Sequence, residues 1–491
     1  MLSLIQNAQK YQDKIAVKDG SGAYTYSALL ELSHRVATHL LDGDDDLNGK
    51  RVAFMVAPSL QYLAVQWGIW RAGGIAVPLC VTYPFPSLQY VIEDTKAAIL
   101  VVGPEYEQVL SPYSEESSVR FIRLKDFQEL AMAELPEFGL DRGAMILYTS
   151  GTTSLPKGVL TTHENIEAQI STLVEAWQWS AEDYTISILP LHHVHGIINV
   201  NSCALWSGAT VHFLPNFDAK TVFQVFLEGQ VNVFMAVPTI YFKLISYFDS
   251  LSDEEKKVLF LRMKSFRLMV SGSAALPVSV MEKWFEVSGH YLLERYGMTE
   301  IGMAISNPYT GERRAGHIGQ ALAGVEVRLC DEQGQELPLD QPGEIQVKGK
   351  NVFKAYWGKP EATAKAFTED GWFRTGDIAV VEDGYFKILG RDSIDIIKSG
   401  GYKISALEIE EVLRTHPAIK DCGVVGIPDD EWGEMVVAFL VVAEPLDTAE
   451  LNQWMRQKMP AYKTPRKYKV VGDLPRNAMG KVTKNELKKL F

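Results

Sequence analysis

The sequence predicts an α/β protein in which a large N-terminal domain of doubly wound sheets precedes a small α+β C-terminal domain. Its 491 residues exceed the length at which one hydrophobic core usually stops growing. Short apolar runs alternate with amphipathic segments over about the first 300 residues, which is typical of parallel sheets covered by helices. The pattern changes near residue 316 and again near residue 390, which indicates two further structural units.

The N-terminal elements follow from apolar periodicity. Helical periodicity predicts helices over residues 26–41 and 59–72, and Gly73 and Gly74 end the second helix. Helical segments also lie between the short apolar runs, so a parallel sheet is expected. These runs predict strands at residues 51–56, 75–79, 144–147, 184–189, 210–214, 231–237 and 266–271.

Residues 316–390 form a predicted β-rich subdomain. Glycine and proline separate its short β-type runs, which favours a small antiparallel unit or barrel; the runs lie at residues 325–329, 343–347, 378–381 and 385–388. Beyond Gly390, a helix over residues 406–415 and strands over residues 421–427 and 436–442 indicate a separate α+β unit. A domain boundary is therefore expected at residues 390–393.

Composition places the chain among ordinary soluble globular proteins, with 47% hydrophobic and 22% charged residues. Its net charge of −13 argues against nucleic acid as a partner, although lysines cluster near the C-terminus. The four cysteines lie far apart without a C-x-x-C pair, which suits a reduced compartment. Neither a signal peptide nor a transmembrane stretch is apparent, so the cytosol is the expected location, without integral membrane contact.

A Gly/Ser/Thr-rich segment, YTSGTTSLPKG at residues 148–158, follows a predicted buried strand. Its glycines allow backbone angles that let successive N–H groups form an anion-binding nest. Hydroxyl donors and one lysine add to this nest: Thr149, Ser150, Thr152, Thr153 and Lys157, with Gly151 between them. The order of a Walker A loop is absent. The segment predicts a polyphosphate site, and the alternative is a plain surface turn.

Six further motifs are less specific when taken singly. The histidines of PLHHVHG at residues 190–196 lack a nearby Cys, Asp or Glu partner, which disfavours zinc. The other motifs are SGSAALP at 271–277, RYGMTE at 295–300, GWFRTGD at 371–377, the glycine-rich junction at 390–401 and PRNAMGK at 475–481. Each of them alone is consistent with a turn or a solvated loop.

Together, in this order and spacing, the motifs resemble those of the adenylate-forming superfamily, which contains acyl-CoA synthetases, peptide-synthetase adenylation domains and luciferases. The resemblance covers nearly the whole chain. It implies that ATP, Mg²⁺ and coenzyme A are used in two steps. A carboxylate first attacks the α-phosphorus of ATP to give an acyl-AMP and pyrophosphate. A thiol, expected to be that of coenzyme A, then displaces AMP.

The resemblance also implies roles for individual residues. Catalytic roles fall to Lys481, Thr299, Glu300 and His193, and Glu300 also holds Mg²⁺. Tyr296 is expected to stack on adenine, Asp377 to accept from the ribose hydroxyls and Arg391 to add a further contact. The remaining implied ATP contacts are the phosphate loop with Lys157, the turn at Gly272, Ser273 and Ala274, and Arg295, Gly297 and Met298.

In this superfamily the C-terminal domain rotates between the two steps. The resemblance implies a hinge at residues 391–393, between an N-terminal domain of residues 1–390 and a mobile domain of residues 394–491. The usual hinge residue is Asp or Lys, and this chain has Ser393 instead, which leaves the pivot open. The segment implied to line the pantetheine tunnel consists of Lys398, Ser399, Gly400, Gly401 and Tyr402.

Arg295 is the main indication of the acid that is activated. Many members have a small residue at this position, whereas a guanidinium suits a second carboxylate. His195 and Lys243 are expected to add positive charge, and Met303 to line the acyl pocket. Alternatively, Arg295 forms a structural ion pair with Glu294. The sequence around the motifs resembles that of malonyl-CoA synthetases. Malonate is therefore the expected acid, with methylmalonate second.

Three other functions remain open. One is a coenzyme A ligase for an o-succinylbenzoate, aromatic or short- to medium-chain fatty acid. Another is an amino-acid-activating domain, for which Asp218 is the one nearby candidate to bind an amino group. The third is a catalytically inactive nucleotide-binding protein, which intact Thr299, Glu300, Asp377 and Lys481 disfavour. Oligomeric state and pathway are not predicted.

Overall fold

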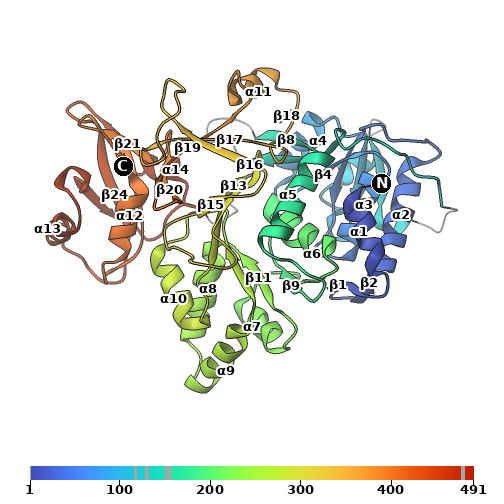
Figure 1. The fold of residues 1–491 in the computed structure, drawn as a ribbon, viewed down its shortest axis with the longest axis horizontal. Helices are drawn as coiled ribbons and strands as arrows, with labels where there is room; N and C mark the ends of the chain where they lie inside the picture. Colours follow the sequence, from blue (N-terminus) through green and yellow to red (C-terminus); the bar gives the residue numbers. More distant parts are fainter. Residues whose placement is uncertain (1, 116–118, 128–131, 150–155, 477–480) are drawn as a thin grey trace.

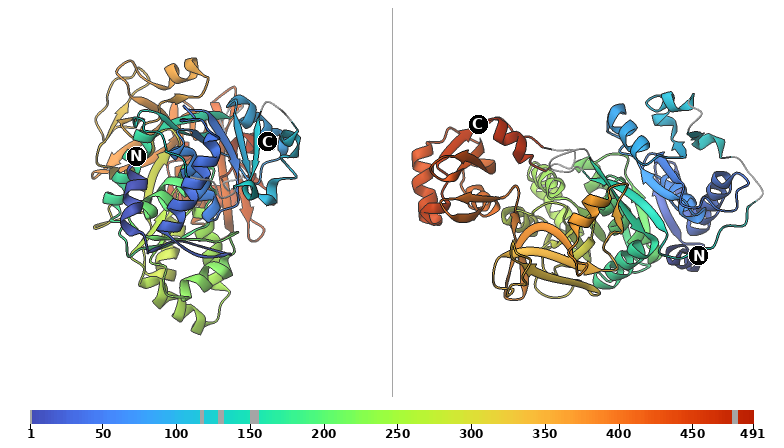
Figure 2. Two further views of the ribbon diagram at one scale, coloured as in Figure 1. Left: turned by 90° about the vertical axis from the view of Figure 1, so that its right-hand side faces the viewer. Right: turned by 90° about the horizontal axis from the view of Figure 1, so that it is seen from above.

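The protein contains two large β-sheets, one small β-sheet and a C-terminal sheet (Figure 1). This computed structural model describes residues 2–115, 119–127, 132–149, 156–476 and 481–491. Seen from above in Figure 2, the C-terminal sheet and its helices form one end of the molecule, and the N-terminal elements form the other. Among the described residues, no helix is long and apolar enough to cross a membrane.

The seven-stranded sheet confirms the strands predicted near residues 51, 75 and 144. In spatial order its strands are β18 (Ala355–Tyr356), β8 (Lys157–Thr162), β7 (Gly143–Thr149), β4 (Ile75–Pro78), β3 (Arg51–Met55), β5 (Ile99–Val102) and β6 (Arg120–Arg123). Val52 and Phe54 of β3 enter one core, and Ala53 and Met55 enter another. Both faces are thus covered, which explains the unbroken apolar runs.

The nine-stranded sheet holds the strands predicted near residues 184, 210, 231 and 266. In spatial order it comprises β15 (Gln320–Ala321), β14 (Gly302–Ser306), β13 (Leu293–Met298), β12 (Leu268–Ser271), β11 (Val233–Ala236), β9 (Tyr184–Ser187), β10 (Thr210–Phe213), β1 (Ile15–Asp19) and β2 (Gly22–Thr25). The six strands from β13 to β1 run parallel. The predicted doubly wound arrangement is therefore present.

Local capping explains where the first long helices begin. Thr25 accepts from the Ala28 N–H at the start of α2 (Tyr26–Leu41), and Ser59 accepts from the Tyr62 N–H at the start of α3 (Leu60–Arg71). Gly73, with φ of 75°, follows the end of α3 as predicted.

The remaining helices of this part lie on both sides of the sheets. One core joins both large sheets through α2, α3, α5 (His163–Ala176), η5 (His195–Ser202) and α6 (Cys203–Trp206). A second core packs α7 (Ala219–Leu227), α8 (Pro238–Asp249), α9 (Asp253–Lys264) and α10 (Val278–Ser288) on the nine-stranded sheet, at the bottom of Figure 1. The other short elements are α1 (Ser3–Ala8), η1 (Gln9–Tyr11), α4 (Phe85–Asp94), η2 (Pro104–Tyr106), η3 (Ser111–Ser114), η4 (Leu124–Asp126) and α11 (Pro360–Ala366).

The β-rich region forms a four-stranded antiparallel sheet of β16 (Val325–Cys330), β17 (Gly343–Gly349), β19 (Phe373–Glu382) and β20 (Tyr385–Arg391). The C-terminal sheet contains β21 (Ile396–Ser399), β22 (Tyr402–Ser405), β23 (Ile419–Asp429), β24 (Gly433–Val442) and β25 (Lys467–Val470). Its helices are α12 (Ala406–Arg414), α13 (Thr448–Lys458), η6 (Ala461–Lys463) and α14 (Lys484–Lys489). The predicted small α+β unit is therefore present.

Candidate active site

The candidate site lies where parallel strands of the nine-stranded sheet end. β9, β11, β12 and β13 run in the same direction, so the segments that follow them emerge at one edge of the sheet. His193 and His195 follow β9, and Ser273 follows β12. Thr299 and Glu300 follow β13. The fold therefore gathers residues that are far apart in the sequence.

Arg295 is the buried cation of this edge. Its residue surface is only 3% exposed, and its guanidinium packs on Gly272, where an added Cβ would come within 2.4 Å of Arg295 Cζ. Nη2 lies 3.5 Å from Ser273 Oγ, and Nε has no hydrogen-bond partner among the described residues. Burial lowers the pKa of Arg295 to about 9, which leaves it charged at neutral pH. The guanidinium therefore retains donor capacity for a ligand.

Glu294 does not act as an ion-pair partner of Arg295. Adjacent side chains of a strand point to opposite faces, and Glu294 Oε1 accepts from the Leu276 N–H at 3.2 Å. Burial raises the pKa of Glu294 to about 8, so this carboxyl group is mostly protonated at neutral pH. This geometry therefore does not favour the alternative in which Arg295 forms a structural ion pair with Glu294.

The two site histidines are neutral near pH 7. His195 Nδ1 lies 3.0 Å from Ser273 Oγ, and burial together with the charge of Arg295 lowers the pKa of His195 well below 6.5. Burial and the charge of Lys481 lower the pKa of His193 to about 4. The expectation that His195 adds positive charge is corrected: its neutral ring instead orients the Ser273 hydroxyl.

The turn from β13 into β14 requires a close approach of the two strands. A Cβ at Gly297 would lie 1.9 Å from the Gly302 carbonyl oxygen and 2.5 Å from Met303 Cε. Glycine is therefore required at residue 297. Met303 is 2% exposed and belongs to the buried core, against which half-buried Met298 packs.

A second cluster joins β13 to the small antiparallel sheet. The Tyr296 hydroxyl donates to Asp377 Oδ2 at 2.7 Å, and Arg391 Nε donates to Asp377 Oδ1 at 3.0 Å. Asp377 and Arg391 face each other across β19 and β20.

Ser273 has a φ of 70° in the turn beside Arg295, so the turn at Gly272 to Ala274 adopts a backbone conformation that is unusual for serine.

Tyr356 is a site residue that the sequence did not predict. Its hydroxyl donates to Glu300 Oε1 at 2.9 Å, and Lys157 Nζ lies 4.9 Å from the centre of its ring. The two-residue strand β18 pairs with β8 and brings Tyr356 to this position. A single tyrosine outside any motif gives no sequence signal. Burial raises the pKa of Glu300 above its usual value, and the hydrogen bond from Tyr356 opposes this shift.

Lys481 enters the site from the C-terminal domain. It still reaches solvent, but partial desolvation and the positive charges of Arg391 and Arg295 lower its pKa, whereas Asp377 opposes that change. Its charge also contributes to the lowered pKa of His193. The structure therefore brings Lys481 together with the two clusters described above.

The hairpin of β21 and β22 carries the five residues expected to contact coenzyme A. Gly400 and Gly401, with φ of 57° and 83°, form its turn. Ser399 is buried, Lys398 Nζ lies 3.9 Å from an Asp392 carboxylate oxygen, and Tyr402 stacks on Tyr462. The hairpin therefore has contacts within its own domain, and Lys403 of β22 also pairs with Glu332 of the N-terminal domain. Ser393 lies in the turn between β20 and β21.

Two sets of predicted residues are not found in these clusters. Ser150, Gly151, Thr152 and Thr153 lie outside the described residues, which end at Thr149 and resume at Pro156. Thr149 and Lys157 pair across β7 and β8. Lys243 lies on the exposed face of α8, where its ammonium faces the ring of Phe217 at 5.7 Å. The structure does not bring Lys243 to Arg295.

The chain matches two family profiles. The profile described as AMP-binding enzyme matches residues 4–357, and the profile described as AMP-binding enzyme C-terminal domain matches residues 408–481. The mitochondrial malonate–CoA ligase ACSF3 of Bos taurus is 44% identical, over 98% of this chain and 89% of that protein. The malonate–CoA ligase of Arabidopsis thaliana is 38% identical, over 97% of this chain and 86% of that protein.

Solved structures of two enzymes also have a fold similar to that of this protein. ATP-bound MatB from Rhodopseudomonas palustris superposes with a TM-score of 0.91 at 34% identity, covering 100% of this chain and 99% of that one. An o-succinylbenzoate CoA synthetase from Bacillus subtilis, in complex with its acyl-adenylate intermediate, gives a TM-score of 0.86 at 27% identity, covering 99% and 98% of the two chains.

The location expected from the sequence is contradicted by these relatives. The similar ligases from Bos taurus and Homo sapiens are named as mitochondrial proteins, whereas the sequence predicted the cytosol. Widely spaced cysteines and the absence of an apparent signal peptide do not distinguish these two compartments.

Proposed function

Because this chain belongs to the AMP-binding enzyme family, we propose that it is an ATP-dependent, AMP-forming ligase that joins a dicarboxylic acid to coenzyme A. The acid that we propose is malonate, with methylmalonate as a second substrate. Similar proteins named malonate–CoA ligases support this acid, because they match nearly the whole chain at 38% to 44% identity. All of these substrates are small molecules.

The observation that carries the proposal is the buried guanidinium of Arg295. A monocarboxylic acid would leave this cation without a counter-charge in a dry pocket, which is costly. Malonate has a second carboxylate, which can accept two N–H donors from one guanidinium while the first carboxylate reacts. The missing side chain at Gly272 leaves room for the guanidinium at this place.

In the first step, one carboxylate oxygen attacks the α-phosphorus of ATP, and pyrophosphate leaves. Two anions must approach each other, so the protein supplies alignment and charge neutralisation. We assign Thr299 to the α-phosphate, and Lys157 with the phosphate loop to the β- and γ-phosphates. Lys481 bridges the ribose and the reacting carboxylate, and His193 lies beside it at the reacting end of the acid.

The adenosine half of ATP is assigned to the second cluster. Tyr296 stacks on adenine beside the turn at Gly272, and Asp377 accepts from the ribose hydroxyls. The contacts of Asp377 with Tyr296 and Arg391 support this assignment, because they hold both carboxylate oxygens before the nucleotide arrives. Such preorganisation reduces the entropy that binding must remove.

The donor set at Glu300 fits Mg²⁺, which prefers carboxylate, phosphate and water oxygens. The Glu300 carboxylate is buried and held by the Tyr356 hydroxyl, and the Thr299 hydroxyl is adjacent in sequence. When bound, the ion neutralises phosphate charge that would otherwise repel the attacking carboxylate. Tyr356 is a positioning residue in this account, since it fixes one oxygen of Glu300.

In the second step, the thiol of coenzyme A attacks the acyl carbon, and AMP leaves. We propose that residues 394–491 turn about Ser393 between the steps. This movement withdraws Lys481 and brings Lys398 to Tyr402 beside the pantetheine arm. Hinged domains commonly separate two half-reactions in this way.

The test is AMP formation with ATP, Mg²⁺ and coenzyme A across malonate, methylmalonate, succinate, acetate, benzoate and o-succinylbenzoate. Malonate should give the highest kcat/KM, followed by methylmalonate. A preference for acetate or benzoate would overturn the role of Arg295 while leaving the ligase chemistry intact. A preference for o-succinylbenzoate would be consistent with the proposed role of Arg295 but would show that malonate is not the preferred acid.

A further inference from the structure

A carboxylate of the C-terminal domain caps a helix of the N-terminal domain. Glu411 Oε2, on α12, accepts from the Val278 N–H at 3.1 Å. Val278 is the first residue of α10, which is preceded by Pro277 and has no side-chain cap of its own and no acidic residue in its first turn. A negative charge is stabilising at such a helix start, because the first N–H groups have no partner within the helix.

The same segment belongs to the nucleotide side of the candidate site. Val278 follows the turn at Gly272 to Ala274 by four residues. Between them, the Leu276 N–H donates to Glu294 Oε1 at 3.2 Å within the N-terminal domain. The N–H groups of Leu276 and Val278 are thus held by glutamate side chains from different domains. Only the contact of Glu411 depends on how the domains are oriented.

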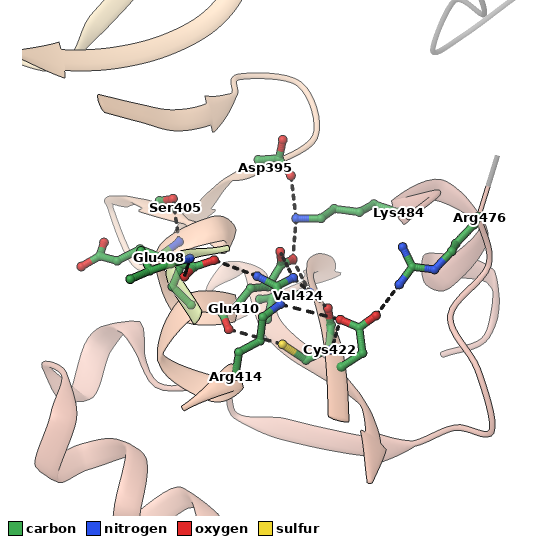
Figure 3. A network of polar contacts seen from close by, with 12 residues as sticks. Asp395, Ser405, Glu408, Glu410, Arg414, Cys422, Val424, Arg476 and Lys484 are labelled. Atoms are coloured by element: carbon green, nitrogen blue, oxygen red, sulfur yellow. Dashed lines mark hydrogen bonds and ion pairs between the residues drawn. The ribbon is translucent and has the colours of Figure 1, made fainter. Parts of the chain in front are cut away.

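An ion-pair network begins at Glu411, and Figure 3 shows its members Arg414, Glu410, Lys484 and Asp395. Arg414 Nη1 donates to Glu411 Oε1 at 3.0 Å, and Arg414 Nη2 lies 3.5 Å from Glu410 Oε2. Glu410 Oε1 lies 2.7 Å from Lys484 Nζ, which is also 2.6 Å from Asp395 Oδ1.

The inner members of this network are rigidly held. The side chains of Glu410 and Lys484 are 5% and 7% exposed. Lys484 lies three residues beyond Lys481, so the network ties the start of α14 to α12. A buried network in which the lysine lies within ion-pair distance of two carboxylates has little freedom to rearrange.

We propose that Glu411 is a positioning residue that seats the C-terminal domain on the first turn of α10 during acyl-AMP formation. This inference rests on the proposed function, in which Lys481 acts only in that step. An ion pair that also joins the domains, Lys403 with Glu332 at 2.7 Å, is about 60% exposed on both sides and contributes little. Glu411 is therefore the residue to test.

The first experiment compares Glu411→Ala with Glu408→Ala. Glu408 lies on the same helix and is similarly exposed, but its carboxylate pairs with Lys463 within the C-terminal domain. ATP–pyrophosphate exchange with malonate should fall about tenfold in Glu411→Ala, and thioester formation from malonyl-AMP and coenzyme A should stay within about twofold. Glu408→Ala should leave both rates within about twofold. Equal losses in the two half-reactions of Glu411→Ala would overturn the proposal.

A backbone variant tests the other partner of the contact. Val278→Pro removes the N–H from which Glu411 accepts a hydrogen bond, and proline is well tolerated at the first position of a helix. We expect the same loss of exchange as in Glu411→Ala, with no further loss when both changes are combined. Additive losses would show that the two groups act independently.

Hydrogen exchange of the backbone amides gives a readout that does not require turnover. The Val278 amide should exchange at least fivefold faster in Glu411→Ala, with ATP and Mg²⁺ present. The Leu276 amide, held by Glu294, is the internal control and should not change. If the wild-type protein shows no exchange activity with any acid, the proposed function fails. An unchanged exchange rate of the Val278 amide would overturn the proposal that Glu411 holds the first turn of α10.

Discussion

At the scale of single residues, Arg295 is expected to determine which acids are accepted. Replacing it by alanine removes the proposed partner of the distal carboxylate. We expect kcat/KM for malonate to fall about 100-fold or more, the order of loss when one partner of a buried charge pair is removed. Residual activity on acetate should change by less than about threefold, because acetate has no second carboxylate.

The matched control for Arg295 is Lys243→Ala. Both cations were predicted to contact the acid, but the ammonium of Lys243 lies at the surface against Phe217. Lys243→Ala should therefore leave malonate turnover unchanged. Equal losses on malonate and acetate in Arg295→Ala would leave only a structural role for the arginine.

Glu294 makes stability depend on pH. Its pKa is raised by burial from its usual 4.5 to about 8 in the folded protein, so folding retains a proton that the unfolded chain releases above about pH 4.5. The free energy of unfolding should fall as pH rises from about 4.5 to 8, by up to about 1.4 kcal/mol per pH unit. Glutamine at this position stays neutral and avoids the loss.

Urea denaturation of Glu294→Gln and the wild-type protein at pH 5, 6, 7 and 8 measures this effect. The stability of the variant relative to the wild-type protein should rise across the series. Glu282→Gln, an exposed change on α10, is the control and should show a constant difference. A constant difference for Glu294→Gln as well would show that Glu294 is ionised in the folded protein.

At the scale of elements, the sequence predicted regular segments well. The expected helix over residues 26–41 and the strands near residues 51, 75, 210 and 343 form within one or two residues of their predicted bounds. Burial on both faces produces unbroken apolar runs, and caps and glycines mark helix ends. These signals are local, so they can be read from the chain alone.

Two elements that were not predicted, η5 and β18, lack such local signals. η5 (His195–Ser202) is a π-helical segment that positions His195, and π-helical geometry has no periodicity that a sequence shows clearly. β18 is only two residues long and depends on pairing with β8. Through these two elements the fold places His195 beside Ser273, and Tyr356 beside Glu300.

At the scale of the whole molecule, the proposed chemistry needs two domain orientations. In this structure Lys481 lies with Arg391, Arg295 and Asp377, as acyl-AMP formation would require. Lys481→Ala should slow ATP–pyrophosphate exchange about 100-fold or more, because a positioned charge at the reacting oxygens is lost. Thioester formation from malonyl-AMP should remain within about twofold.

The control for Lys481 is Lys489→Ala, an exposed change on α14 that removes only a pairing with Glu486. It should leave both half-reactions unchanged. A parallel loss of both half-reactions in Lys481→Ala would contradict the account of two orientations.

The order of the motifs predicted which residues gather at the candidate site, but it did not predict how their side chains are oriented. The motifs indicated which residues would gather, and the structure brings together Arg295, Tyr296, Glu300, Asp377 and Lys481 as expected. The sequence could not predict that Lys243 faces outward or that Glu294 turns away from Arg295. Those outcomes depend on which face of an element packs against the core, and tertiary contacts decide this.

The packing of Arg295 on Gly272 links two positions into one unit of evolutionary change. A methyl group at residue 272 would overlap the guanidinium in its present position, so a descendant with a larger residue there would have to move the guanidinium away from this place. A descendant that exchanges the arginine for a small residue gains free volume at the same place and loses its charge. One codon change at residue 295 would then replace the preference for a second carboxylate by space for a bulkier, apolar acid, and it would also remove this constraint on residue 272.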